Sequence, residues 1–359
     1  MDFVTQVTLG GAVGQATMNR ELGNKAVLWG MLAGALPDLD VLAYPLMDEI
    51  SQLTWHRGIS HSILLTVVLT PLLGWLISRV HRRAVTVEKA ALFTFLAIGS
   101  HILIDLLTVY GTQILAPFSN RQFEWNVLFI IDPLFTLPLL FFLILSLFPG
   151  EVRAKLFRNA IGIILATAYV IVALLFKFSA VDSFERALER QDITPERLMV
   201  TSTPFNTVLW RAVAETHDGY WIGYHSLLDE TAEIPFWFVP RNDHLLRDIE
   251  DQRAIKTLRW FSEDWFNVQQ TPEGALYFRD LRFGDMDMGM PAHSFGMGPP
   301  RDLAFTFTFA LLESGGAGTE RLTLRQEFPE PEGYGEILEV LWERIKGRKA
   351  QVPGLPVVE

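Results

Sequence analysis

The chain has no cysteine among its 359 residues. This absence excludes disulfide scaffolds, cysteine-based zinc sites, iron–sulfur clusters and thiol nucleophiles. Basic residues are also few, with 30 Lys and Arg against 41 Asp and Glu and a formal net charge of −11. An acidic chain lacks the positive field that binding to phosphate backbones needs, so we expect no nucleic-acid partner. Apolar residues are plentiful, at 50%, which excludes a disordered chain.

Charged residues are scarce only in the first half of the chain. Residues 1–178 carry 12 Lys/Arg and 11 Asp/Glu, whereas residues 179–359 carry 18 and 30. A nearly uncharged apolar half followed by an acidic half is typical of a membrane domain joined to a soluble domain. We therefore expect a membrane domain at 1–178 and a soluble domain at 179–359. The first 20 residues lack the basic region of a signal peptide, so we expect none there.

Four apolar segments are long enough to cross a bilayer core as helices, at about 20 residues each. They are residues 59–80, 90–110, 127–148 and 159–178. Two shorter apolar stretches, residues 3–18 and 26–36, predict either half-helices or tightly packed N-terminal helices shielded by the spans. The predicted fold of this half is an α-helical integral membrane domain with four spans and two short N-terminal helices.

The acidic half predicts a soluble, strand-rich α+β domain. A polar amphipathic helix is expected at 182–191 and a second helix at 334–346. Residues 286–300 are rich in Gly, Met and Pro and predict a loop. Aromatic and β-branched runs at short spacing favour a mostly antiparallel sheet. These runs are residues 206–214, 220–225, 236–239, 275–282 and 304–312.

Lys and Arg in the short loops predict the orientation in the membrane. Basic residues gather between the first two spans, at 79–89, and between the last two, at 153–158. Both loops are therefore expected on the cytoplasmic side. Alternation of the spans then places residues 38–58, residues 111–126 and everything after 178 on the outer face. The soluble domain is thus expected to be extracytoplasmic.

Ionisable residues in or beside the spans are costly in a bilayer, so each one is a candidate for function. His101 and Asp105 are four residues apart and share one helix face, as two metal ligands do, or a His and its orienting carboxylate. Asp38 and Asp40 follow Pro37 and point the same way if the chain there is extended. Each pair also has a structural interpretation, as a self-satisfied His–Asp pair or a solvated turn.

His56 and His61 flank Arg57 in the run WHRGISHS. The two imidazoles can converge only where the glycine between them breaks the helix. Arg57 would suit an anionic substrate group such as phosphate. The predicted orientation places all these candidates, together with Asp132 and Gln6, in the outer half of the bilayer. Imidazole and carboxylate ligands in one site suit Zn²⁺, Mn²⁺ or Fe²⁺ better than Ca²⁺.

These motifs resemble the YdjM-like family of membrane-bound metal-dependent hydrolases. The likeness rests on DFVTQ at Asp2–Gln6, PDLD at Pro37–Asp40, HRGISHS at His56–Ser62 and HILID at His101–Asp105. It extends through YGTQ at 110–113 and IDPLFTLP at 131–138, and so covers roughly the first 140 residues.

The resemblance implies a site for a divalent metal and a hydrolase activity. We expect Zn²⁺ as the cofactor, with Mn²⁺ or Fe²⁺ as alternatives. Many members carry His where this chain has Gln6, and an amide is a weaker ligand, which argues against a second metal more than against the first. The resemblance implies six metal ligands: Asp38, Asp40, His56, His61, His101 and Asp105.

The sequence thus predicts a multi-pass, metal-dependent hydrolase of the bacterial inner membrane. The metal would activate water, Asp38 or Asp105 would accept its proton, and Arg57 would hold an anionic group. A lipid or lipid-linked phosphoester at the outer leaflet is the expected substrate. Two alternatives stay open, a proton- or ion-relay transporter and a non-catalytic membrane anchor with a structural metal. No inverted repeat supports the transporter, and a closed coordination sphere would favour the anchor.

Overall fold

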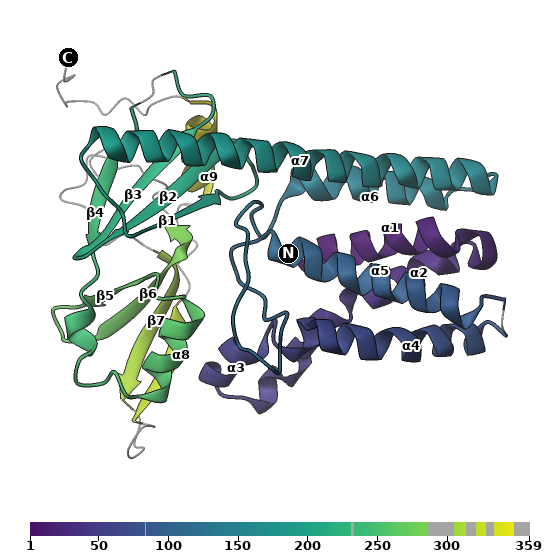
Figure 1. Ribbon diagram of the computed structural model, residues 1–359, viewed down its shortest axis with the longest axis horizontal. Helices are drawn as coiled ribbons and strands as arrows, with labels where there is room; N and C mark the ends of the chain where they lie inside the picture. Colours follow the sequence, from purple (N-terminus) through teal and green to yellow (C-terminus); the bar gives the residue numbers. More distant parts are fainter. Residues whose placement is uncertain (83, 231–232, 286–304, 314–320, 328–333, 348–359) are drawn as a thin grey trace. The chain divides into compact units, whose positions relative to one another are not determined.

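The chain forms two compact units in the computed structural model (Figure 1). The helical unit comprises Met1–Leu174 with Pro204–Asn206, and the strand unit comprises Leu175–Thr203 with Thr207–Glu359. The loop predicted at 286–300 lies outside the described residues. The structure describes the whole chain except residues 83, 231–232, 286–304, 314–320, 328–333 and 348–359.

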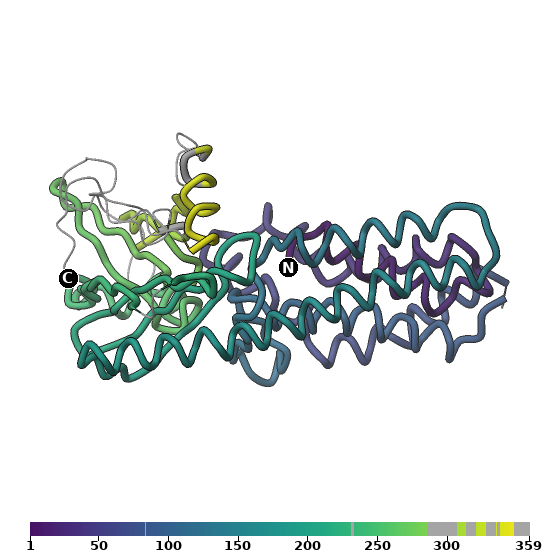
Figure 2. The backbone as a smooth tube through the Cα atoms, turned by 90° about the horizontal axis from the view of Figure 1, so that it is seen from above, coloured from purple at the N-terminus to yellow at the C-terminus, as the bar shows by residue number. Residues whose placement is uncertain are grey.

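The helical unit is built from helices that run alongside one another in both views (Figures 1 and 2). Buried side chains such as Val27, Leu139 and Ala173 form a core between them. The last part of α7 belongs to the strand unit. The elements in chain order are α1 (Phe3–Leu22), α2 (Lys25–Ala35), η1 (Pro37–Leu46), α3 (Glu49–Trp55), η2 (Ile59–His61), α4 (Ile63–Val80), α5 (Val87–Leu106), α6 (Pro133–Leu147) and α7 (Val152–Arg190).

Three described helices, α4, α5 and α7, are long and apolar enough to cross a membrane. They coincide with the spans predicted at 59–80, 90–110 and 159–178. In place of the span predicted at 127–148 the structure has α6, whose 15 residues extend about 22 Å, less than a bilayer core of about 30 Å. Pro133 begins this helix, and the chain just before it is not helical. The predicted count of four is reached only when α2 and η1, bent by 51°, count as one span.

The helix α7 continues where the sequence predicted two helices, a span and a separate polar helix. Residues 179–190 change from apolar to charged, but they contain neither glycine nor proline. A change of polarity alone does not end a helix, because charged residues such as Glu and Arg are good helix formers. One helix of 39 residues therefore runs from Val152 to Arg190.

Glycines bring α1 and α2 into backbone contact. A Cβ atom at Gly30 would lie 2.1 Å from the carbonyl oxygen of Gly10, and one at Gly14 would lie 2.1 Å from that of Ala26. Only glycine fits at these distances. Close approach at small residues is typical of helices that pack within membranes. It also fixes the end of α2, where Gly34 and the following residues contribute to the site described below.

The described part of the strand unit contains two four-stranded antiparallel sheets, each with its strands in chain order. The predicted strand-rich, mostly antiparallel region is therefore confirmed. The first sheet contains β1 (Arg197–Ser202), β2 (Leu209–Thr216), β3 (Gly219–Ser226) and β4 (Phe236–Pro240). The second contains β5 (Phe266–Gln270), β6 (Leu276–Asp285), β7 (Phe305–Glu313) and β8 (Leu322–Glu327). Three helices complete the described part: η3 (Asp243–Leu246), α8 (Arg253–Phe261) and α9 (Tyr334–Ile345).

Each sheet of the strand unit is covered by a helix. Phe184 of α7 and Trp210 of β2 are fully buried in one core cluster. Phe261 of α8 stacks against two side chains of the second sheet. Its ring centroid lies 6.4 Å from that of Phe283 and 6.3 Å from that of Phe307. These aromatic side chains bury large apolar areas, so both sheets have their own hydrophobic core.

Candidate metal centre

Pro37 determines where Asp38 lies. α2 ends at Ala35, because proline lacks the N–H that a helix needs and disfavours helical geometry at the residue before it. The chain then bends by 51° and continues as the 3₁₀ helix η1. Successive residues of a 3₁₀ helix are about 120° apart, so Asp38 and Asp40 lie on different sides of η1. The extended chain that would have pointed both carboxylates the same way is not formed.

A sharp turn brings His61 into the interior. Arg57 adopts a left-handed conformation with φ 56°, and a Cβ at Gly58 would lie 2.9 Å from a backbone carbonyl oxygen. The chain then forms η2, which ends at His61. The ring of His61 is fully buried, and its Nδ1 lies 2.9 Å from Ser60 Oγ. Ser60 Oγ donates in turn to Asp40 Oδ2 at 2.6 Å.

His101 and Asp105 project from one face of α5, one turn apart, as their spacing predicts. Both side chains are fully buried. His101 Nδ1 lies 2.6 Å from the carbonyl oxygen of Gly34. A carbonyl oxygen only accepts hydrogen bonds, so Nδ1 carries a proton, and in the neutral imidazole Nε2 presents its lone pair.

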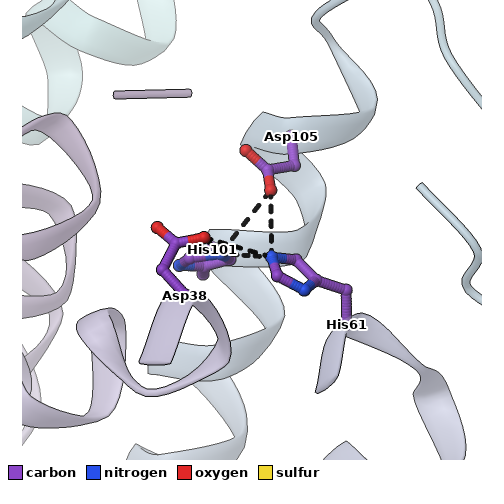
Figure 3. A group of neighbouring side chains, drawn as sticks. All are labelled: Asp38, His61, His101 and Asp105. Carbon is purple, nitrogen blue, oxygen red and sulfur yellow. Dashed lines mark hydrogen bonds and ion pairs between the residues drawn. The ribbon is translucent and has the colours of Figure 1, made fainter. Parts of the chain in front are cut away.

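Four ligand atoms from η1, η2 and α5 converge on one point (Figure 3). His61 Nε2 lies 3.3 Å from Asp38 Oδ1, 3.4 Å from Asp105 Oδ2 and 3.1 Å from His101 Nε2. His101 Nε2 lies 3.6 Å from Asp38 Oδ1 and 3.5 Å from Asp105 Oδ2. Ligand atoms about 2.0–2.2 Å from a tetrahedral metal ion are about 3.3–3.6 Å from one another. Four of the five distances fall in this range and the one between the two imidazoles is slightly shorter, so the spacing is close to that of a divalent-metal site.

The chemistry of the four ligands also fits a cation. Asp105 Oδ2 is buried and has no hydrogen-bond partner, although an unpaired carboxylate oxygen is costly to bury. The Nε2 atoms of His61 and His101 face each other, and two lone pairs repel unless a cation or a proton lies between them. Two imidazoles with two carboxylates are ligands that zinc, manganese and iron accept. The structure thus has a buried Asp/His group that can hold a divalent metal, as the sequence predicts.

Two of the six predicted ligands, Asp40 and His56, lie outside this group. His56 Nδ1 is 3.0 Å from Asp40 Oδ1, and Asp40 Oδ2 accepts from Ser60. Asp40 Oδ2 also lies 3.8 Å from Nδ1 of His61, the ring nitrogen that does not face the other ligands. Asp40 therefore supports the ring of His61 through Ser60, and His56 is its hydrogen-bonded neighbour.

Arg57 lies inside the site, with a side chain that is only 4% exposed. Its Nη2 is 3.1 Å from Asp105 Oδ1, and its Nη1 donates to Thr108 Oγ1 at 3.0 Å. The guanidinium also lies over the ring of Tyr110, 4.7 Å from the centroid. Both terminal nitrogens are engaged within the protein, so the charge of Arg57 acts on Asp105.

Gln6 and Asp132, which the predicted orientation placed near the site, have different surroundings. Gln6 Nε2 donates to Asp105 Oδ1 at 2.8 Å, and the amino group of Met1 contacts the same oxygen. Asp132 instead caps α6 by accepting from backbone N–H groups in its first turn, and it accepts from the hydroxyl of Tyr169 at 2.9 Å. Gln6 therefore belongs to the surroundings of the four ligands, and Asp132 stabilises the start of a helix.

Sequence reasoning missed the groups that orient the two imidazoles. Ser60 lies within the HRGISHS run, and its position beside His61 was the available signal. The carbonyl oxygen of Gly34 gives no such signal, because every residue type offers the same backbone atom.

The helical unit resembles known membrane proteins. Residues 1–183, just over half of the chain, match the family described as YdjM inner membrane protein. The uncharacterized protein YfhP of Bacillus subtilis is 29% identical over 140 residues, which cover 37% of this chain and 42% of YfhP. The inner membrane protein YbcI of Escherichia coli is 28% identical over 129 residues, which cover 35% of this chain and 73% of YbcI. No solved structure matches the chain.

The match to YfhP spans less than half of that protein, and the matches to YfhP and YbcI cover only 37% and 35% of this chain. Neither relative therefore supplies an activity for the whole chain. The matched family region includes all four convergent ligands and the three candidate spans α4, α5 and α7, apart from the end of α7. On this match, the chain belongs to the YdjM family of inner membrane proteins.

Proposed function

We propose that the protein is a divalent-metal-dependent hydrolase embedded in the membrane. The observation that carries the proposal is the convergence of four ligand atoms, with Asp105 Oδ2 buried among them and without a hydrogen-bond partner. Three of the four side chains are fully buried, whereas that of Asp38 is 15% exposed. The site therefore has one accessible edge, at Asp38, where a substrate can approach.

A divalent cation at this site would polarise a scissile ester and lower the pKa of a water molecule. The side chains would orient the reactants and take up the proton. Asp38 is our candidate for the proton acceptor, because one of its oxygens faces the other ligands while the second points away from them (Figure 3). Asp105 is less suited, since Gln6 and Arg57 already bind its Oδ1. We assign Arg57 to orienting Asp105, in place of the predicted contact with substrate.

Lipids or lipid-linked phosphoesters are the substrate class that we propose. η1, which carries Asp38, exposes Leu39, Leu42 and Leu46. Moving exposed apolar side chains from water into contact with acyl chains lowers their free energy. The inner-membrane location of the family supports the same substrate class.

We also propose that the metal centre and the soluble domain, residues 179–359, lie on the extracytoplasmic side of a membrane domain at 1–178. The support is the distribution of basic residues. Basic residues lie in or next to three turns of the helical unit: Lys25 begins α2, Arg82 lies between α4 and α5, and Arg153 is in the first turn of α7. Short loops rich in Lys and Arg stay in the cytoplasm, so the opposite end of the helical unit would face outward.

Hydrolysis by the full chain in detergent micelles tests the proposed activity. Phospholipids and water-soluble phosphodiesters are offered as substrates, with Zn²⁺ or Mn²⁺ added. We expect His61→Ala and His101→Ala to lose activity by more than about 100-fold, since even partners of metal ligands contribute up to that factor. His217→Ala is the matched control, because His217 is exposed in the turn between β2 and β3. Hydrolysis that persists in both ligand variants would refute the proposal.

A structural metal clamp is the second candidate function. Four protein ligands complete a tetrahedral sphere, which is typical of structural zinc sites, whereas catalytic sites keep one position open. The clamp would tie η1 and η2 to α5. In that case a chelator lowers the Tm, and the metal-loaded protein hydrolyses none of the esters. The hydrolysis experiment above therefore separates the two candidates.

A further inference from the structure

The two oxygens of Asp105 have different surroundings. Oδ2 faces the three other ligand atoms and accepts no hydrogen bond. Oδ1 lies 3.1 Å from Nη2 of Arg57 and accepts from Nε2 of Gln6 at 2.8 Å. The amino group of Met1 contacts the same oxygen. A carboxylate oxygen has about two lone pairs, so these donors fill Oδ1 and leave only Oδ2 for a cation.

This asymmetry bears on the number of metal ions. Centres with two metals place the ions about 3.5–4 Å apart, where groups that bind both ions hold them together. Asp105 cannot bridge two ions while Oδ1 is occupied by Arg57, Gln6 and the amino group of Met1. The guanidinium also places a positive charge next to Oδ1, and this charge would repel a second cation there.

Asp40 offers no free carboxylate oxygen to a second ion either. Both oxygens of Asp40 are engaged, Oδ1 by Nδ1 of His56 at 3.0 Å and Oδ2 by Ser60. Asp40 Oδ2 also accepts from the backbone N–H of Arg57 at 3.3 Å. Within the described ranges, the four convergent ligands are the one group of three or more His and acidic side chains that could hold an ion.

We propose that the centre binds a single divalent cation, and that Arg57 and Gln6 are positioning residues that keep it mononuclear. They saturate Asp105 Oδ1, turn Oδ2 toward the cation and occupy the place that a second ion would take. Asp40 and His56 then orient His61 and do not bind metal. This inference rests on the proposed metal-dependent function and narrows it to chemistry at one ion.

Titration of the purified full chain with Mn²⁺ tests the inference directly. Bound manganese is counted by elemental mass spectrometry, and its electron paramagnetic resonance spectrum shows whether ions are magnetically coupled. We expect one equivalent of Mn²⁺ and an uncoupled spectrum. Two equivalents with a coupled spectrum would overturn this inference and leave the hydrolase proposal standing. No bound ion would overturn both.

Variants at the two positioning residues give a second test. The double variant Arg57→Gln, Gln6→Glu removes the guanidinium charge and adds a carboxylate beside Asp105, which also offsets the charge of the Met1 amino group. We therefore expect it to take up a second equivalent with a coupled spectrum. Arg57→Lys keeps the charge and should keep one equivalent. If the double variant does not fold, Arg57→Gln alone is titrated, with a second, weaker equivalent as the expected result.

Matched substitutions outside the site control for the change of charge. Arg79→Gln replaces an exposed arginine at the end of α4, and Gln270→Glu replaces an exposed glutamine at the end of β5. Both should bind one equivalent, as the wild type does. If the folded Arg57→Gln variant, alone or with Gln6→Glu, still binds one equivalent of Mn²⁺, then Arg57 and Gln6 do not set the number of ions.

Discussion

The imidazoles of His61 and His101 can bind a cation through only one nitrogen each. Nδ1 of His101 donates to the carbonyl oxygen of Gly34, and Nδ1 of His61 lies beside Ser60 Oγ, whose proton goes to Asp40. These bonds place a proton on Nδ1 in both rings, so that each neutral ring presents the lone pair of Nε2. Outer partners of this kind orient metal ligands and raise their basicity.

We predict that Ser60→Ala weakens metal binding without abolishing it. The variant loses the link between His61 and Asp40, so the ring is free to rotate and to carry its proton on either nitrogen. Loss of such a partner lowers metal affinity by about 10- to 100-fold. Competition with a chelator measures the change. Thr54→Ala is the control, because the hydroxyl of Thr54 bonds only to a backbone carbonyl oxygen within α3. Equal affinities in the two variants would contradict the role given to Ser60.

Asp229 gives a residue-scale prediction in the strand unit. Its side chain accepts from His225, from Arg344 of α9 and from the backbone N–H of Ser226. Burial alone would raise the pKa of Asp229, but the bonds from His225 and Arg344 outweigh burial and lower it from 3.8 to about 2. The unfolded chain therefore takes up the proton at a higher pH than the folded chain does. The stabilisation by ionised Asp229 is complete above about pH 4 and is lost as the pH falls toward 2.

We expect Asp229→Asn to reduce the dependence of the free energy of unfolding on pH between 4 and 2. Hydrogen exchange in β2 and β3 measures this stability in the full chain. Asp251→Asn is the control, since the side chain of Asp251 is 86% exposed and pairs only with Lys256 in the described contacts. A pH dependence that is the same in both variants would show that Asp229 contributes nothing in this range.

The residues of the site were predictable to different degrees. His101 and Asp105 could be paired from sequence, because their spacing of four fixes a shared helix face. The separation of Asp38 from Asp40 could not, since it depends on a 3₁₀ helix after Pro37 that periodicity does not reveal. The burial of Arg57 beside Asp105 depends on a left-handed residue and on contacts between η2 and α5, which local sequence does not encode.

At the scale of elements, the contact of α1 with α2 supports the site. Gly30 meets Gly10 at a distance that admits no side chain, and Gly34, one turn further along α2, accepts from His101. The position of Asp38 depends on the same helix, because η1 follows α2 directly. Any substitution that separates α1 from α2 should therefore disturb both stability and metal binding.

We predict that Gly30→Ala destabilises the protein and weakens its metal affinity. A methyl group there would lie 2.1 Å from Gly10 O, and overpacking of this kind costs about 1–3 kcal/mol. Gly99→Ala is the matched control on α5, where the added methyl group meets nothing within 4 Å. The control should gain up to about 1 kcal/mol from helix propensity. Thermal unfolding in detergent measures both, and a stabilised Gly30→Ala variant would contradict the packing described.

Helices and strands were predicted correctly where the sequence has clear hydrophobic runs. α4, α5 and five of the strands lie where they were expected. β1, β5 and β8 were missed, and β5 illustrates why, since only two of its five residues, FNVQQ, are aromatic or β-branched. α8 was also missed, because a helix of nine residues offers only two turns of pattern.

At the scale of the whole molecule, the proposed topology places the strand unit on the extracytoplasmic side. Single introduced cysteines can test this placement, because the wild-type sequence has none. A cysteine introduced as His217→Cys should react with a membrane-impermeant thiol reagent in cells with a permeable outer membrane. A cysteine introduced as Arg82→Cys should react only after the inner membrane is disrupted. The wild-type chain, which has no cysteine, is the control for background labelling. The opposite pattern would place the strand unit in the cytoplasm.

The central claim is that one buried group of two imidazoles and two carboxylates holds a divalent metal. Its most direct test is the metal content of the detergent-purified chain, measured by elemental mass spectrometry after purification without chelator. The wild type is compared with His61→Ala and His101→Ala, and with His217→Ala as the control. We expect one equivalent of metal in the wild type and in the control, and none in the two ligand variants. A wild type that stays metal-free when Zn²⁺, Mn²⁺ or Fe²⁺ is supplied, or ligand variants that keep their metal, would contradict the claim.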